Sequence, residues 1–300
     1  MKNKGIYLVL LTALISGVAV FLNKFAVVFW SNSSVFTTAK NLIVTMLLVC
    51  LVIFVGKLPE LKNLSKKDWL RLVAIGFIGG SVPFLLFFKG LTLTSATNAA
   101  FIHKTLFIWV ALLAVPFLKE KLSKLQIFSL GLLVVGTYLF AGSLKLKFGY
   151  GEFLILLATL LWAAENIVAK IALRNVSSLT TAWGRMFFGS IFLMIYLGFS
   201  GGLGKIFVPP EGISWLALSS VILFGYVITW YAALKSLPAT VASAILVIAA
   251  PITALLDSVF VTHRLKPTIL ISCLIIALGT ILIIRIYERA YSVLQIRLSS

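Results

Sequence analysis

Residues 95–118 have the sequence SATNAAFIHKTLFIWVALLAVPFL. The stretch is long and apolar enough to cross a bilayer as a helix, which takes about 20 residues. It nevertheless carries His103 and Lys104 near its middle. A central Lys opposes insertion by about 3 kcal/mol, whereas each Leu, Ile, Phe or Val favours it by about 0.3–0.6 kcal/mol, and the stretch is rich in these four types. We therefore expect a transmembrane helix whose Lys104 faces protein or water and takes part in function.

The pattern of this stretch recurs later in the chain. Residues 87–122 align without a gap with residues 230–265, and residues 5–24 align with residues 151–170. The identity is low, but glycine, polar and apolar positions follow one another in the same order. The charged pair of the first stretch belongs to one copy only. This self-similarity predicts a chain built from two repeats.

The composition indicates a membrane protein. The chain is 61% hydrophobic and only 11% charged, against about 25% charged residues in a soluble domain. The net charge of +18 does not indicate nucleic-acid binding, because most Lys and Arg lie in short loops between apolar spans rather than on one solvated face. We expect no nucleic-acid partner.

We predict an all-α membrane protein with ten transmembrane helices. Strands would need short alternating segments, and the sequence has none. The predicted spans cover residues 6–28, 34–56, 69–89, 95–118, 124–143, 150–172, 178–200, 213–234, 239–261 and 267–286.

Five spans per copy is an odd number, so the second copy must enter the membrane from the opposite side. Inverted repeats of this kind are used by secondary transporters to alternate access around a central site. The first repeat is predicted to cover residues 1–143, the second residues 144–286, and a cytoplasmic tail residues 287–300.

The distribution of loop charges predicts the orientation. With the N-terminus in the cytoplasm, most loop Lys and Arg lie on the cytoplasmic side, as the positive-inside rule requires. Both termini are then cytoplasmic, in a multi-pass protein of the inner or plasma membrane. The basic residues on the outer side would be Lys145, Lys147, Lys205, Arg264 and Lys266.

Two segments carry a resemblance to a known family. They are residues 111–140, ALLAVPFLKEKLSKLQIFSLGLLVVGTYLF, and residues 250–283, APITALLDSVFVTHRLKPTILISCLIIALGTILI. With the five-plus-five spans, they resemble the EamA-like transporters of the drug/metabolite transporter superfamily over essentially the whole chain. That family typically has a Pro, an apolar run, Gly-Glu-Arg/Lys-Leu and a Gly-containing final helix here.

Individual positions follow this family pattern unevenly. Glu120 and the two residues after it match, whereas His263 replaces the Glu in the second copy. The typical Pro is present as Pro251. The family's Arg early in the second span corresponds to Arg185, and Lys40 takes its place in the first copy. The resemblance implies transport of a small organic metabolite, amino-acid-like or related, in the outward direction.

A candidate cavity wall lies in residues 157–170, LATLLWAAENIVAK. Trp162, Glu165 and Asn166 recur at i, i+3 and i+4 and so share one helix face. Glu165 would be a proton carrier, because burial favours the neutral acid. The alternative is a packing role in which Lys104 or a bound proton neutralises the acid, and a Lys104–Glu165 pair is expected when the site is empty.

Further candidates have two interpretations each. Tyr226, Trp230 and Tyr231 line the substrate cavity or belong to the interfacial aromatic belt. His103 passes protons on or is a structural residue. The charges nearer the ends of their spans are expected to reach the lipid headgroups; they are Lys24, Lys40, Lys89 and Arg185.

No catalytic or metal-ligating pattern is present. The chain has no P-loop, no Ser/His/Asp set and no CxxC spacing for its two cysteines, so we expect neither an enzyme nor a cofactor. The expected partners are a small-molecule substrate, the lipid bilayer and a coupling proton. Two alternatives stay open, a carrier of an organic or phosphorylated anion and a non-transporting membrane scaffold.

Overall fold

A computed structural model describes residues 2–30, 32–143, 148–202 and 210–299, and in these ranges the chain is helical without strands. The helices are α1 (Lys2–Ala26), η1 (Val27–Phe29), α2 (Ser33–Phe54), α3 (Leu58–Lys62), α4 (Lys66–Gly80), α5 (Val82–Leu93), α6 (Ala96–Lys104), α7 (Leu106–Leu118), α8 (Lys124–Ser143), α9 (Tyr150–Ala172), α10 (Ser178–Phe199), η3 (Pro210–Gly212), α11 (Ile213–Ser236), α12 (Ala239–Leu246), α13 (Ala249–Asp257), η4 (Ser258–Thr262) and α14 (Pro267–Ser299).

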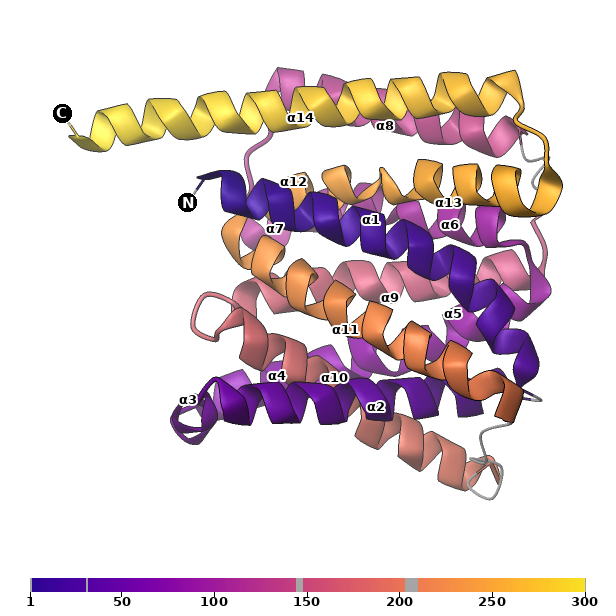
Figure 1. Cartoon of the computed structure of the whole chain (residues 1–300). Coiled ribbons are helices and arrows are strands. Elements are labelled where there is room, and N and C mark those ends of the chain that lie inside the picture. The colour runs from indigo at the N-terminus through magenta and orange to yellow at the C-terminus, as the bar shows by residue number, and fades with distance from the viewer. Residues whose placement is uncertain (1, 31, 144–147, 203–209, 300) are drawn as a thin grey trace.

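The helices are arranged as a membrane bundle. Most run along one common direction, and the first and last helices have their free ends at the same end of the bundle (Figure 1). In the described part of the chain, nine helical stretches are long and apolar enough to cross a membrane, and Lys124–Phe140 forms a shorter apolar helix. The all-α membrane fold predicted from the sequence is therefore confirmed.

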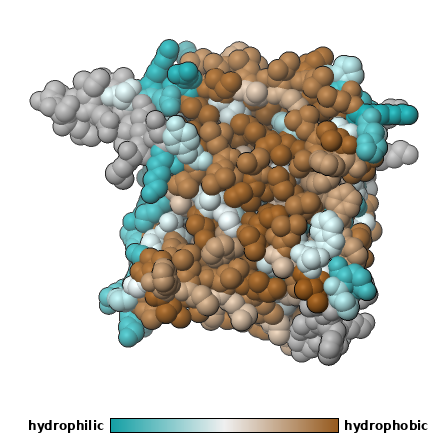
Figure 2. All heavy atoms as spheres, in the orientation of Figure 1, coloured by the Kyte–Doolittle hydropathy of each residue, from teal (hydrophilic) through white to brown (hydrophobic). Residues whose placement is uncertain are grey.

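The surface of the bundle suits a lipid environment. A hydrophobic band covers the middle of the molecule, and hydrophilic residues gather towards its two ends (Figure 2). Large apolar side chains point outwards, such as Leu274, which is 70% exposed, and Met46, which is 68% exposed. An apolar surface of this extent indicates contact with the acyl chains of a membrane.

The two repeats pack in equivalent ways. Helix α1 packs along α11, as α9 packs along α5, and α2 packs on α11 as α10 packs on α4. The last helices of the two repeats, α8 and α14, lie side by side (Figure 1). The two-repeat layout expected from the sequence alignment is thus present in the packing.

Two aligned lysines make the same contact in the two repeats. The Nζ of Lys24 donates to the carbonyl oxygen of Leu91 at 2.8 Å, and the Nζ of Lys170 donates to the carbonyl oxygen of Leu234 at 2.6 Å. Both carbonyls lie in the last turn of a helix, where a cation complements the helix dipole. Lys24 therefore caps a helix, which corrects the prediction that it reaches the lipid headgroups.

The third span, predicted as one helix, is broken between α4 and α5. Ser81, at φ −129° and ψ −78°, lies outside the helical region. Two residues later, Pro83 has no N–H to offer the carbonyl of Gly79, which lies four residues before it. The second repeat has no such break in its third span, since α11 is continuous.

The fourth and ninth spans are broken at aligned positions. Helix α6 ends before Thr105, whose N–H donates to the carbonyl of Ile102 at 3.1 Å, and in the second repeat the N–H of Ile248 donates to the carbonyl of Ile245 at 3.2 Å. These bonds to the third residue back form tight turns between two half-helices in each repeat. The last helix is longer than predicted, because α14 continues past residue 286 to Ser299.

Candidate functional site

A cavity of about 70 Å³ lies at mid-length of the helices, between the two repeats. Helices α1, α2, α5, α6, α7, α9, α10 and α11 contribute to its walls. The space is sufficient for a few water molecules or a ligand of a few heavy atoms. The cavity walls include these predicted site residues: His103, Trp162, Glu165, Asn166, Tyr226 and Trp230.

The remaining two predicted site residues lie behind the cavity wall. The ammonium of Lys104 donates to the hydroxyl of Ser16 at 2.7 Å, and Ser16 lines the cavity. The hydroxyl of Tyr231 donates to the Glu165 carboxylate at 2.5 Å. Lys104 and Glu165 therefore have separate partners, and no ion pair joins them in the described part of the chain. The pair expected from the sequence is wrong for this conformation.

Trp162, Glu165 and Asn166 lie on one buried face of α9, as the sequence periodicity predicted. Trp162 and Asn166 are buried with Glu165, which is only 1% exposed. The side-chain oxygen of Asn166 accepts a hydrogen bond from the Nε1 of Trp230 at 3.1 Å. A Cβ on Gly79 would overlap the side chain of Glu165, so glycine at this position leaves the space that the acid occupies.

The break in the third span is stabilised by residues around the cavity. The freed carbonyl of Gly79 accepts hydrogen bonds from the Nε1 of Trp162 at 2.9 Å and from the Nη2 of Arg185 at 3.0 Å. The neighbouring carbonyl of Gly80 accepts from the Nδ2 of Asn41 at 3.0 Å. Because lipid offers no replacement donors, such bonds are needed wherever a membrane helix is interrupted.

Lys40 and Arg185 are the site residues that sequence reasoning missed. Both line the cavity, and they are 1% and 3% exposed, which corrects the prediction that they reach the lipid headgroups. Both also contact the ring of Phe84, with the Nζ of Lys40 at 5.8 Å and the Cζ of Arg185 at 5.5 Å from its centroid. The alignment of Lys40 with Arg185 between the repeats was the available signal, because it put a basic residue in the same position twice.

Several buried polar atoms of the cavity have no protein partner in the described residues. They are Asn23 Oδ1, His103 Nδ1, Arg185 Nε and Ser219 Oγ, and all four residues line the cavity. Buried polar groups in native proteins are almost always hydrogen-bonded to protein or water. These atoms are therefore available to a polar ligand or to water in the cavity.

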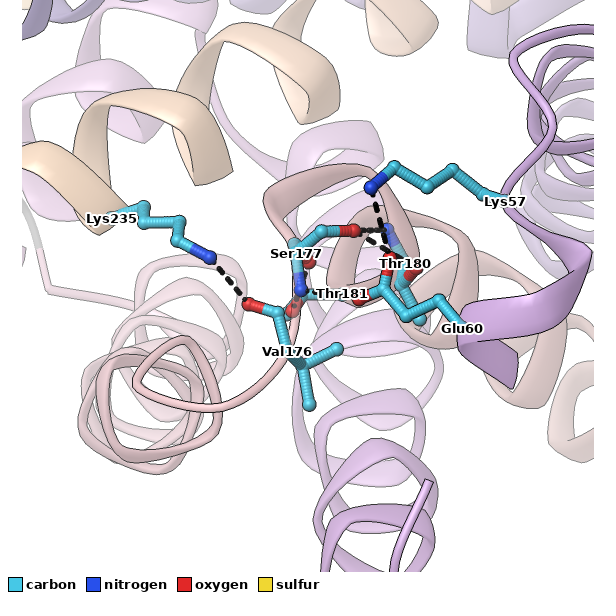
Figure 3. A network of polar contacts seen from close by, with 7 residues as sticks. All are labelled: Lys57, Glu60, Val176, Ser177, Thr180, Thr181 and Lys235. Atoms are coloured by element: carbon cyan, nitrogen blue, oxygen red, sulfur yellow. Dashed lines mark hydrogen bonds and ion pairs between the residues drawn. The ribbon is translucent and has the colours of Figure 1, made fainter. Parts of the chain in front are cut away.

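Two glutamates tie the repeats together at the end of the bundle where α1 begins. The Glu120 carboxylate accepts from the N–H of Ala239 at 2.6 Å, at the start of α12. The Glu60 carboxylate accepts from the N–H of Ser177 at 2.6 Å, just before α10, and lies 3.3 Å from the Nζ of Lys57 (Figure 3). Both acids belong to the first repeat and both helices to the second, so each contact joins the two repeats.

The Glu60 tie is part of a larger polar network. Figure 3 shows Lys235 pointing at the residue before Ser177, and its Nζ donates to the carbonyl of Val176 at 2.9 Å. Burial raises the pKa of the Glu60 carboxyl, but the hydrogen bond from Ser177 and the charge of Lys57 outweigh it, so the pKa lies below its ordinary value. The acid is thereby held in its charged form.

One contact joins aligned residues of the two repeats directly. The hydroxyls of Thr45 in α2 and Ser190 in α10 lie 2.8 Å apart, buried between the helices. Thr45 and Ser190 follow Lys40 and Arg185 by the same number of residues. The second helices of the repeats therefore meet at equivalent positions, close to the cavity.

The site contains no described metal cluster. No group of three His, Cys, Asp or Glu side chains could hold a metal ion within the ranges that the structure covers. The polar atoms around the cavity are instead amide, hydroxyl, imidazole, carboxylate and cationic groups, a set that can recognise an organic ligand by hydrogen bonds and charge.

Comparisons with known proteins agree with this architecture. The uncharacterized transporter YyaM of Bacillus subtilis (strain 168) is 25% identical over 292 residues, which cover 94% of each chain. An uncharacterized transporter of Haemophilus influenzae is 30% identical over 174 residues, covering 56% of this chain and 53% of its own. A protein of known crystal structure superimposes with a TM-score of 0.67 at 14% identity, covering 93% of this chain and 97% of that one, which supports the fold.

The family comparison covers both repeats. The model of the EamA-like transporter family matches residues 3–142 and again residues 149–285. The two matches correspond to the two sets of helices that pack in equivalent ways. The chain belongs to the EamA-like transporter family, and it is a multi-pass membrane transporter.

Proposed function

We propose that the protein is a secondary transporter that exports a small organic metabolite, amino-acid-like or related, across the cytoplasmic membrane by alternating access. The observation that carries this proposal is the cavity between the repeats, whose walls hold buried polar atoms without protein partners in the described residues. A site at mid-length between inverted repeats is where such transporters bind their substrates.

The charges of the cavity support a zwitterionic substrate. Lys40 and Arg185 offer positive charge, and Glu165 offers negative charge, all in the same cavity. A molecule with a carboxylate and an ammonium group can complement both signs, which favours amino-acid-like ligands. The cavity volume of about 70 Å³ favours a small one.

The orientation and the division of the chain are part of the same proposal. Both termini are placed in the cytoplasm because most loop Lys and Arg then lie on the inner side. We take residues 1–143 and 144–286 as the two repeats and residues 287–300 as a cytoplasmic tail. Outward transport of the substrate is supported by the family alone.

Glu165 is proposed to carry a coupling proton. It is buried in the cavity wall, and Tyr231 donates to it from behind the wall. Exchange of a proton at this carboxylate would change the charge of the cavity during transport. Replacement of Glu165 by Gln should then remove the pH dependence of the flux, and an unchanged pH profile of this variant would show that Glu165 does not carry the proton.

A second candidate is a carrier of organic anions. Lys40 and Arg185 line the cavity together with a single acid, and Lys104 adds a further buried cation just behind the wall. This excess of positive charge favours an anionic substrate over a neutral one.

The test is a flux measurement on purified protein in liposomes. Counterflow of labelled amino acids, nucleosides and organic anions is compared with protein-free liposomes, and we expect saturable flux for the amino acids. Flux of organic anions alone would favour the second candidate. Flux of none of the three classes would contradict the proposal.

A matched pair of variants links the flux to the cavity. Asn23→Ala removes a cavity oxygen that has no protein partner, so it should lower substrate affinity without weakening the fold. Asn63→Ala removes an exposed amide in the loop before α4 and should leave the flux unchanged. Equal effects of the two substitutions would argue against substrate binding at this cavity.

A further inference from the structure

Lys40 differs from the other buried cations at the centre of the bundle. Lys104 donates to Ser16, and Arg185 donates to the carbonyl of Gly79. Lys40 is 1% exposed, and its ammonium has neither a hydrogen-bond acceptor nor an acid as partner in the ranges that the structure describes. Its closest recorded contact is the ring of Phe88, whose centroid lies 3.9 Å from the Nζ.

The aromatic rings around Lys40 do not compensate the burial of its charge. The rings of Phe36 and Phe84 lie at 5.2 and 5.8 Å from the Nζ, in addition to Phe88. Cation–π contacts are weaker than an ion pair, and two of these three rings are more than 5 Å away, whereas removing an unpaired ammonium from water is costly. A negative partner would offset this cost.

The one direction left for such a partner is the cavity, because Lys40 lines it. Arg185 adds a second donor on the same wall, since its Nε has no protein partner and both cations contact the ring of Phe84. Two N–H donors that face one space suit the two oxygens of a carboxylate. A phosphate, which has more oxygens, would need more donors than these two.

We propose that Lys40, assisted by the Nε of Arg185, forms the subsite that binds the carboxylate of the substrate. The proposal rests on the proposed function, in which the cavity is the substrate site. The remaining unpartnered atoms, Asn23 Oδ1, His103 Nδ1 and Ser219 Oγ, are then left for the rest of the ligand. Lys40 thereby selects substrates that carry a carboxylate over their neutral analogues.

The experiment compares acetate with acetamide on the purified full-length protein in detergent. The two probes have nearly the same shape and differ in charge, and ionic strength is kept constant with sodium chloride. A ligand that binds only the folded protein raises its unfolding temperature. We expect acetate to raise the unfolding temperature of the wild type and acetamide to have a much smaller effect.

Three variants assign the effect to Lys40. Lys40→Arg keeps the charge and should retain the preference for acetate, whereas Lys40→Met should weaken acetate binding by about tenfold or more, as expected for a lost charge-assisted hydrogen bond. Lys89→Met removes an exposed lysine from α5 and should bind acetate as the wild type does. Because the readout is the shift caused by the probe, it does not depend on how each substitution changes stability itself.

Two results would overturn the proposal: equal shifts with acetate and acetamide in the wild type, or an acetate preference that survives in Lys40→Met. If Lys40→Met yields no folded protein, Lys40→Gln replaces it under the same criteria. A protein that binds acetate through Lys40 but transports nothing would contradict the proposed function and leave this subsite standing. A protein that transports its substrate but whose acetate binding does not depend on Lys40 would contradict this subsite and leave the proposed function standing.

Discussion

The carboxylate of Glu165 is held in the cavity wall by a 2.5 Å hydrogen bond from the hydroxyl of Tyr231. The two side chains are 1% and 0% exposed. At this depth an unpaired donor or acceptor is costly, and lipid offers no replacement for the lost partner. The phenol therefore serves to position the acid.

We expect Tyr231→Phe to lower the free energy of unfolding by about 1–3 kcal/mol, because Glu165 loses its partner. The measurement is denaturant unfolding of the purified protein in detergent. Tyr138→Phe is the matched control, since Tyr138 is 73% exposed. In a Glu165→Gln background the cost of Tyr231→Phe should be smaller, and equal costs in both backgrounds would refute the positioning role.

Residue-level prediction from the sequence succeeded for helix faces and failed for the direction of single cations. The i, i+3, i+4 pattern put Trp162, Glu165 and Asn166 on one face, and all three line the cavity. For Lys40 and Arg185, only the depth of each residue along its span could be predicted from the sequence. A long side chain near the end of a span can reach the headgroups or the interior, and only the rotation of the helix decides which.

At the scale of elements, close contact between α4 and α10 determines the shape of the site. A Cβ on Gly189 would lie 2.6 Å from the carbonyl oxygen of Gly80, so the two backbones approach more closely than side chains would permit. The contact lies directly beside the break in the third span, whose freed carbonyl at Gly79 binds Arg185. Small residues at helix contacts allow this approach in membranes.

Gly189→Ala should therefore destabilise the protein by about 1–3 kcal/mol through overpacking against backbone. Gly131→Ala is the control, because nothing lies within 4 Å of a Cβ at that position, and alanine in a helix interior is favoured over glycine by about 0.5–1 kcal/mol. Thermal unfolding of both variants gives the comparison. A Gly189→Ala protein as stable as Gly131→Ala would show that the helices can separate without cost.

The short element α3 is tied to α10 through Glu60, whose lowered pKa makes this contact pH-dependent. A carboxyl with a lowered folded-state pKa stabilises the protein above its unfolded pKa of about 4.5, and this stabilisation is lost as the pH falls through the folded-state value. We expect Glu60→Gln to flatten the fall in unfolding temperature as the pH falls from about 5.5 to about 3.

Glu211→Gln, at an exposed position in η3, corrects for the loss of one negative charge in this comparison. Parallel melting curves across the same pH range are sufficient. If wild type and Glu60→Gln lose stability equally on acidification, the tie between α3 and α10 does not contribute to the pH dependence.

The helix breaks show which features of the helices can be predicted from the sequence and which cannot. Pro83 and Pro251 are helix-breaking residues that can be recognised in the sequence, and each lies just after a break. Thr105 has no proline nearby on its C-terminal side, yet the fourth span breaks there as the ninth does at Ile248. The aligned position in the other repeat was the only sequence signal, because the turn results from packing around the cavity and not from local preference.

For the whole molecule, the central prediction is the opposite orientation of the two repeats. Cysteines at Lys67 and Lys121 should react with a membrane-impermeant thiol reagent only from the cytoplasm, and cysteines at Gly149 and Glu211 only from outside. All four positions are exposed at the ends of the bundle. The measurement compares labelling of intact cells with labelling of opened membranes.

The native cysteines, Cys50 and Cys273, are first replaced by alanine so that each engineered thiol is the only one. If both pairs of positions react from the same side, the two repeats are parallel and the transport proposal loses its structural basis. The reverse pattern, with the first pair outside, would keep the inverted repeats but move both termini out of the cytoplasm.

The hydrogen bond between Thr45 and Ser190 has a geometric consequence for any alternating-access cycle. Atoms related by a two-fold rotation can touch only where the rotation axis passes, so this contact lies on the pseudo-symmetry axis of the molecule. If the two repeats exchange their conformations, Thr45 takes the place of Ser190 and Ser190 that of Thr45, so the contact between them is kept. In the alternating-access cycle that we propose, Thr45 and Ser190 would form a fixed point, with the same local structure in the inward-facing and outward-facing states while the rest of the bundle changes around it.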